Sequence, residues 1–100
     1  MEKIGLQQYE LTVILDPGIL EEDVPQALDK LNSLITKYGG EVVETDHWGR
    51  RRLSYPIKRH AEGNYVMTRM GMEPDSTSEL ESEMNITLDY LRHLLIKVGE

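Results

Sequence analysis

Hydrophobic residues follow two different periods along this chain, and the order in which the periods alternate restricts the folds open to it. Tyr9 to Leu15 alternates with a period of two, which is typical of a half-buried strand. From about Leu20 to Tyr38, apolar residues recur at steps of three and four, which predicts an amphipathic helix. Asp16-Pro17-Gly18 predicts a turn between them, with a side-chain acceptor, a fixed φ and a glycine.

Extended patterns return in the middle of the chain. Glu41 to about Ile57 predicts a long second strand, and Gly49 within it indicates a bulge or bend. Arg59 to Gly63 is interpreted as the hairpin connection. Tyr65 to Met72 then predicts a third strand, with Val66, Thr68 and Met70 on one face.

The last third of the chain predicts one short helix and one strand. Ser76 and Glu79 have the spacing of a capping box, which indicates the start of a helix that carries Leu80 and Met84. Tyr90 to Val98 is rich in Leu and Ile and predicts the fourth strand.

The resulting order, strand-helix-strand-strand-helix-strand, predicts an α+β fold of the ferredoxin-like βαββαβ type. Right-handed crossovers place two helices on one face of a four-stranded antiparallel sheet, with the second and fourth strands at the edges. Pro56 also requires an edge strand, because it has no amide hydrogen to donate. We expect a single domain over residues 1–100, with the other sheet face left open for a partner.

Charge is distributed unevenly along the chain. Eleven Lys and Arg against eighteen Asp and Glu give a net charge of −7, which disfavours a polyanionic partner overall. However, no acidic residue lies between His47 and Ala61, and five of the eleven cations do. We expect these five to form a basic rim that binds RNA phosphates, because the guanidinium fork suits phosphate and stacks on bases. They are Arg50, Arg51, Arg52, Lys58 and Arg59.

A regular strand would not direct the arginine run toward one surface. Arg50 and Arg52 would point one way and Arg51 the other, unless a bulge at Gly49 re-aimed them. The alternative interpretation is that these charges protect an exposed edge strand against aggregation. Trp48 beside them could stack on a base or pack on the sheet.

Tyr65, Met67 and Arg69 are predicted to share the uncovered face of the third strand. Aromatic, Met and Arg side chains are enriched in protein interfaces, so this face is a candidate for a protein partner. Ordinary surface positions, or burial beneath a loop, remain the alternative.

Catalytic and metal-binding patterns are missing from the sequence. There is no cysteine, and His47, His60 and His93 do not have the short spacings of metal sites. Glycine-rich phosphate loops and nucleophile elbows are also absent, so we expect no enzyme activity, cofactor, metal or small-molecule substrate. No hydrophobic signal or membrane-spanning run occurs, so we expect a cytoplasmic protein.

Residues Gly49 to Ile57 read G-R-R-R-L-S-Y-P-I, which resembles the signature of the bacterial small-subunit ribosomal protein six family. The resemblance extends from Tyr9-Glu10, through Tyr38-Gly39, to the closing strand around Leu94 to Val98. It covers nearly the whole chain, and every fixed position of the signature matches.

This resemblance implies the same ferredoxin-like fold and a structural, non-catalytic role in the small ribosomal subunit. It implies binding of the central domain of small-subunit (16S-type) rRNA together with ribosomal protein eighteen, with Arg50, Arg51 and Arg52 facing the RNA. Many members continue past the last strand into a polar tail that touches the partner, whereas this sequence ends at Glu100, which leaves that contact open. The alternative is a small-molecule-binding regulatory domain of the same fold.

Overall fold

The computed structural model describes residues 6–57 and 59–99, and it confirms the predicted order of strands and helices. The strands are β1 (Gln7–Leu15), β2 (Glu41–Ile57), β3 (His60–Met72) and β4 (Tyr90–Lys97). The helices are α1 (Val24–Lys37) and α2 (Thr77–Ile86), each preceded by a short 3₁₀ turn. Of the helices in these described residues, none is long and apolar enough to cross a membrane.

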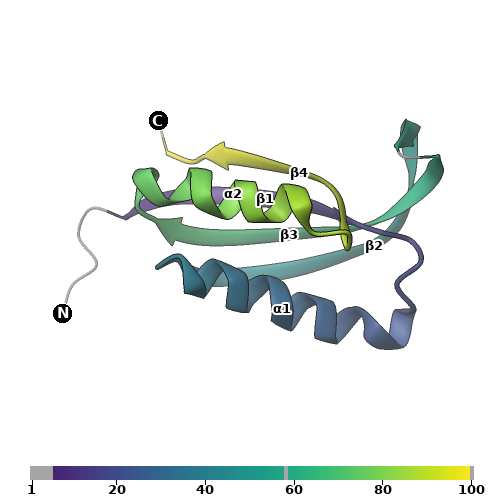
Figure 1. Ribbon diagram of the computed structural model, residues 1–100, viewed down its shortest axis with the longest axis horizontal. Coiled ribbons are helices and arrows are strands. Elements are labelled where there is room, and N and C mark those ends of the chain that lie inside the picture. Colours follow the sequence, from purple (N-terminus) through teal and green to yellow (C-terminus); the bar gives the residue numbers. More distant parts are fainter. Residues whose placement is uncertain (1–5, 58, 100) are drawn as a thin grey trace.

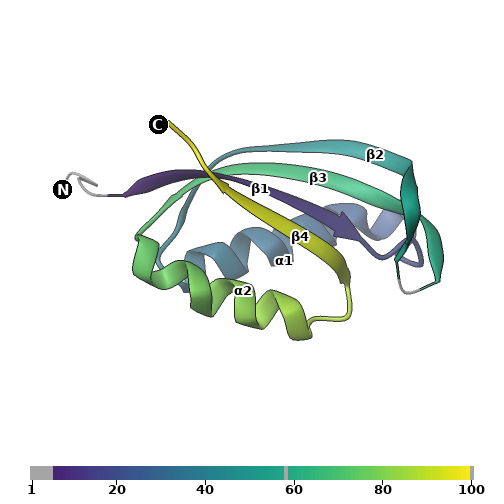
Figure 2. The ribbon, with the colours of Figure 1, turned by 90° about the horizontal axis from the view of Figure 1, so that it is seen from above.

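The sheet has the predicted topology. Its strand order is β2-β3-β1-β4 and all neighbouring strands are antiparallel, so β1 and β3 are central. Pro56 therefore lies on an edge strand, in the stretch between Arg52 and Ile57 where the pairing register shifts. Both helices cover the same face of the sheet (Figures 1 and 2). The arrangement is ferredoxin-like, and no described helix covers the other face, which we call the open face.

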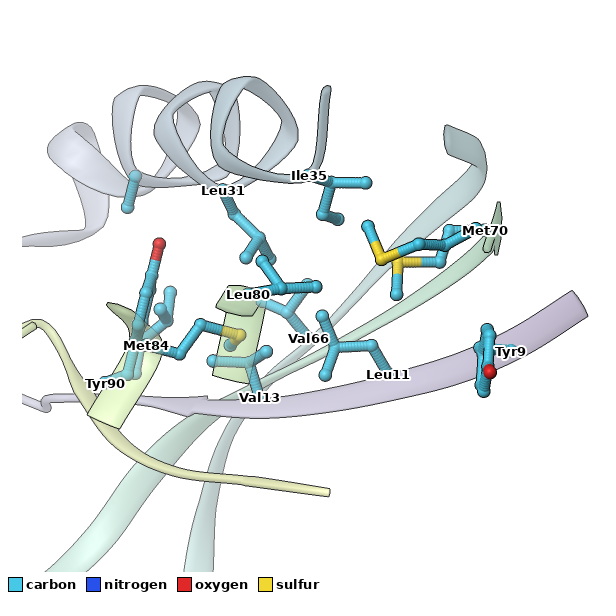
Figure 3. Packing of buried hydrophobic residues seen from close by; sticks show 13 residues of the cluster. Tyr9, Leu11, Val13, Leu31, Ile35, Val66, Met70, Leu80, Met84 and Tyr90 are labelled. Carbon is cyan, nitrogen blue, oxygen red and sulfur yellow. The ribbon is translucent and has the colours of Figure 1, made fainter. Parts of the chain in front are cut away.

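The core lies between the sheet and the two helices (Figure 3). Alternate residues of β1 and β3 face the helices and are buried, as the two-residue period predicts. Burial of each large aliphatic side chain contributes roughly 1.5–3 kcal/mol, so this layer supplies most of the hydrophobic stabilisation. The fully buried members include Leu11, Val13, Leu31, Ile35, Val66, Met70 and Leu80.

The turn before α1 and the end of α1 follow local sequence rules. The Gly18 amide donates to Asp16 Oδ1 at 2.7 Å, which is the side-chain acceptor expected for this turn. Pro25 occupies the first helical turn, where its missing N–H leaves no bond unmade. Gly39 ends the helix with a φ of +82°, and the next amide donates back to Ile35 O at 2.9 Å.

The predicted hairpin connection is wrong in its length. Residues 60–63 belong to β3, and His60 pairs directly with Ile57, so the connection comprises only residues 58 and 59. Arg59 makes this tight turn with a φ of +72°. Gly63 resembled a turn residue in the sequence, but it serves a close approach instead, because a Cβ at this position would overlap Ile14 Cγ2.

The predicted capping box at α2 is not formed. Ser76 is the last residue of a 3₁₀ turn and its side chain caps nothing. The Thr77 hydroxyl instead donates to Pro74 O at 2.8 Å, so the polar residues here stabilise the turn rather than the helix start. The helix nevertheless docks as expected, through the buried Leu80 and Met84.

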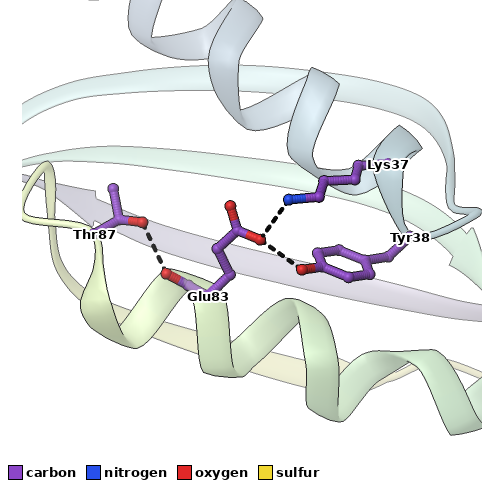
Figure 4. A network of polar contacts seen from close by, with 4 residues as sticks. All are labelled: Lys37, Tyr38, Glu83 and Thr87. Atoms are coloured by element: carbon purple, nitrogen blue, oxygen red, sulfur yellow. Dashed lines mark hydrogen bonds and ion pairs between the residues drawn. The ribbon is translucent and has the colours of Figure 1, made fainter.

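The two helices are joined across their solvent side by a polar network (Figure 4). Glu83 Oε1 of α2 accepts hydrogen bonds from the Tyr38 hydroxyl at 2.5 Å and from Lys37 Nζ at 3.0 Å. The Tyr38 and Lys37 donors, in that order, lower the pKa of Glu83 below its ordinary value. The bond to Glu83 likewise raises the pKa of Lys37 and of Tyr38.

The lowered pKa of Glu83 predicts a pH-dependent stabilisation. A carboxylate with a lowered folded-state pKa stabilises the fold above its unfolded pKa, near 4.5, and the effect disappears as pH falls through the folded pKa. We therefore expect Glu83→Gln to lower the free energy of unfolding at pH 7 and to approach wild type at pH 3. Urea unfolding at both pH values measures this. Glu79→Gln, an exposed position on the same helix, is the control, and a Glu83→Gln effect that is equal at both pH values would contradict the assignment.

Candidate nucleic-acid interface

The β2–β3 hairpin extends beyond the rest of the sheet. The central strand β1 ends at Leu15, opposite Asn64, whereas β2 and β3 continue to residues 57 and 60. We call residues 50–63, apart from residue 58, the distal hairpin. It lies at the end of the molecule away from both chain termini (Figures 1 and 2). A two-stranded ribbon offers both of its faces and its tip to a partner.

The structure brings the arginine run to this hairpin but distributes it over two faces. The predicted bulge is present, since the register shifts between His47 and Gly49 and Gly49 has a φ of +95°. Beyond the bulge the pairing is regular again, with Arg50 opposite Asn64 and Arg51 opposite Gly63. Adjacent arginines therefore alternate, so the bulge does not aim all three toward one surface.

Arg50 and Arg52 lie on the side of the helices. The partner of Arg50, Asn64, is itself opposite the core residue Leu15. Arg50 donates to Pro17 O at 3.1 Å and lies 3.6 Å from the Glu62 carboxylate, although its side chain stays 40% exposed. Arg52 is exposed, and within residues 6–57 and 59–99 it has no ion pair.

Arg51 points to the opposite side and lies over the Trp48 ring, 5.6 Å from its centroid. Trp48 remains 45% exposed with this cation–π contact to Arg51, so its side chain is not buried in the core. Arg59 at the tip is exposed too. Lys58, the fifth predicted cation, lies outside the described residues.

One cation near the distal hairpin was missed by sequence reasoning. Arg92 of β4 is exposed and donates through Nη1 to the Tyr55 hydroxyl at 2.5 Å. It is forty residues from the arginine run in the chain, so no local pattern could connect the two. The predicted strand order was the available signal, since β4 lies beside β1 at the base of the hairpin.

The distal hairpin is held by an apolar cluster at its base. Leu53 is buried against Ile14 and Leu91, with Ile57 and Tyr65 packed beside them. A hollow of about 260 Å³ lies next to this cluster, bordered by Tyr55 of the hairpin and Leu94 of β4 among others.

Tyr65, Met67 and Arg69 do share the open face. They pair with Ile14, Thr12 and Glu10 of β1, which are the positions that alternate with the core residues. Arg69 lies between two carboxylates, 3.9 Å from Glu10 and 3.7 Å from Glu44.

Sequence reasoning missed the apolar part of this face. Leu94 and Ile96 of β4 pair with Thr12 and Glu10, so they lie on the same face, where they are 57% and 47% exposed. The open face therefore combines exposed aliphatic groups with paired charges, which is the composition of a protein interface.

The fold and this site define a small ferredoxin-like domain with a cationic hairpin at one end and an open sheet face. Residues 8–97 match the family described as Ribosomal protein S6. The chain belongs to the ribosomal protein S6 family, a family of the small ribosomal subunit.

Individual relatives support this membership over the full domain. The small ribosomal subunit protein bS6 of Desulforamulus reducens is 38% identical over 95% of this chain and 100% of its own length. The protein of the same name from Mycolicibacterium paratuberculosis is 41% identical over 95% of this chain and 99% of its own. The crystal structure of 30S ribosomal protein S6 from Thermotoga maritima has the same fold, with a TM-score of 0.85 and 22% identity over 93% of this chain and 88% of that one.

Proposed function

We propose that this protein binds small-subunit rRNA through the distal hairpin and ribosomal protein eighteen through the open face, as a non-catalytic constituent of the cytoplasmic ribosome. The observation that carries the RNA part is the location of the cations. Arg50, Arg51, Arg52 and Arg59 are all exposed on one protruding ribbon. Phosphates lie along a curved backbone in folded RNA, so cations on both faces and the tip of a ribbon can contact more than one strand segment.

The charge on the rest of the molecule supports RNA binding at the hairpin, because acidic surface repels RNA elsewhere. The net charge is −7, although the hairpin region is basic, so the remaining surface is strongly acidic. Exposed carboxylates lie on both helices, for example Asp29 of α1 and Glu79 of α2. RNA that approaches the helices is repelled, and RNA that approaches the hairpin is attracted.

The location and composition of the open face support the proposal that a protein partner binds there. It lies next to the distal hairpin without being part of it, so a protein can cover the face while RNA contacts the ribbon. Leu94, Ile96 and Met67 provide apolar surface there. The charged rim of Arg69, Glu10 and Glu44 would fix the orientation of the partner.

The RNA proposal predicts a salt-dependent loss of affinity in arginine variants. We expect Arg50, Arg51 and Arg52 changed together to alanine to weaken binding of a central-domain rRNA fragment, measured with the partner protein present. The loss should be on the order of tenfold or more, and the slope of log K against log salt should become shallower by about 2–3 units. Filter binding or fluorescence titration at several salt concentrations measures both quantities.

A matched pair of single variants separates the site from general charge. Arg52→Ala and Lys30→Ala each remove one exposed cation, but Lys30 lies on α1. Only Arg52→Ala should flatten the salt dependence, by about one unit. Equal effects of the two variants, or no effect of the triple change, would rule out this role of the run.

The partner proposal predicts that a charge on the open face prevents association. Met67→Glu places a carboxylate beside Asp46 and Thr12 and should weaken binding to ribosomal protein eighteen by at least about fivefold, measured by isothermal titration calorimetry. Gln26→Glu adds the same charge on the exposed side of α1 and serves as the control. Wild-type affinity in Met67→Glu would place the partner elsewhere.

A further inference from the structure

Polar side chains of β2 and β3 meet the β1–α1 turn at three points. Arg50 Nη2 donates to Pro17 O at 3.1 Å. His60 Nε2 lies 3.8 Å from Asp16 Oδ2. Asn64 Nδ2 donates to Glu21 Oε2 at 3.5 Å. We call these three the turn contacts. Arg50 and Asn64 contact this turn from the base of the hairpin, and His60 contacts it from beside the tip.

The turn contacts lie where the sheet no longer supports the hairpin. The pairing of β1 with β3 ends at Leu15 opposite Asn64, and the chain leaves the sheet at Asp16. Ladder bonds beyond this point join β2 and β3 only to each other, so they do not fix the angle of the ribbon to the body. The apolar cluster of Ile14, Leu53 and Leu91 restrains one side of the ribbon. The turn contacts restrain the side that carries Arg50.

The contact between Asn64 and Glu21 differs from one between two surface side chains, because it satisfies a buried polar group. Its side chain is fully buried, and its Oδ1 is 2.6 Å from His47 Nε2. Its amide donors need a partner because a buried donor without one loses its hydration uncompensated. Glu21 is the partner that the structure supplies. Asn64 therefore couples the edge strand, the central hairpin strand and the turn.

We propose that Asp16 and Glu21 are positioning residues, which hold the distal hairpin at the angle required for RNA binding without touching the RNA themselves. This inference rests on the proposed RNA-binding function of the hairpin. It assigns a role in recognition to two acidic side chains in a turn that precedes the basic run by about thirty residues in the sequence.

The proposal reverses the sign that simple electrostatics predicts. Asp16 and Glu21 are negative charges beside a cationic ribbon, so their removal should strengthen binding of a polyanion if charge alone matters. If they position the hairpin, their removal should weaken binding, because the ribbon must then be ordered when RNA binds. Both effects change the same measured affinity, so whether the affinity rises or falls distinguishes between them.

The test compares Asp16→Asn and Glu21→Ala with Glu22→Ala in binding to the central-domain rRNA fragment with the partner present. Asparagine keeps the side-chain acceptor for the Gly18 amide, so the turn itself is retained. Glu22 is the matched control, because it is an exposed carboxylate in the same 3₁₀ turn. We expect about three- to tenfold weaker binding for Asp16→Asn and Glu21→Ala, and equal or tighter binding for Glu22→Ala.

Two readouts distinguish positioning from other effects. The slope of affinity against salt should stay at the wild-type value in Asp16→Asn and Glu21→Ala, because no phosphate contact is lost. Amide ¹⁵N relaxation of the free proteins should show greater mobility for residues 50–57 and 59–63, with the sheet and helices unchanged.

Binding by Asp16→Asn and Glu21→Ala that is as tight as, or tighter than, that of Glu22→Ala would overturn the proposal, and so would unchanged hairpin relaxation. A failure of the underlying RNA-binding function looks different. In that case wild type and the arginine variants would bind the RNA equally, whereas the relaxation change in the free Asp16 and Glu21 variants could still be observed.

Discussion

The distal hairpin depends on one close packing contact. β3 passes over Ile14 at Gly63, where no side chain would fit, and this approach allows Leu53 to be buried against Ile14 and Leu91. Without it, the ribbon beyond the end of β1 would be two strands in water, which is marginally stable by itself. The cationic side chains are therefore presented by a ribbon that apolar packing attaches to the sheet.

Burial and charge are divided between different parts of this small protein. The core between the sheet and the helices stabilises the fold, and it leaves the hairpin arginines and the open face exposed. Most of the acidic residues lie away from the hairpin region, so they do not compete with phosphate for the hairpin arginines. Asp16, Glu21 and Glu62 are exceptions, and each of them contacts a side chain of β2 or β3 in or beside the hairpin. Local polar contacts thus hold the geometry of a region whose overall charge attracts RNA.

The sequence predicted what short-range rules determine. Periodicity identified the first three strands and α1, whereas the Ser76–Glu79 spacing and the Leu and Ile content indicated α2 and β4. Pro56 indicated the edge strand, and Gly49 indicated the bulge. The hairpin length was wrong because Gly63 has a role in packing, not turning, and periodicity does not distinguish the two. The direction of the arginines, Arg92 and the turn contacts depend on register and on contacts between distant segments, which have no local signature.

The central claim is that RNA meets this protein at the distal hairpin and not at its helices. Titration of the ¹⁵N-labelled protein, bound to unlabelled partner, with the central-domain rRNA fragment tests it most directly, because amide chemical shifts report the site residue by residue. The account predicts the largest shifts within residues 47–57 and 59–63, including the indole N–H of Trp48, and little change in α1 and α2. Shifts concentrated on the outer surface of either helix would contradict it.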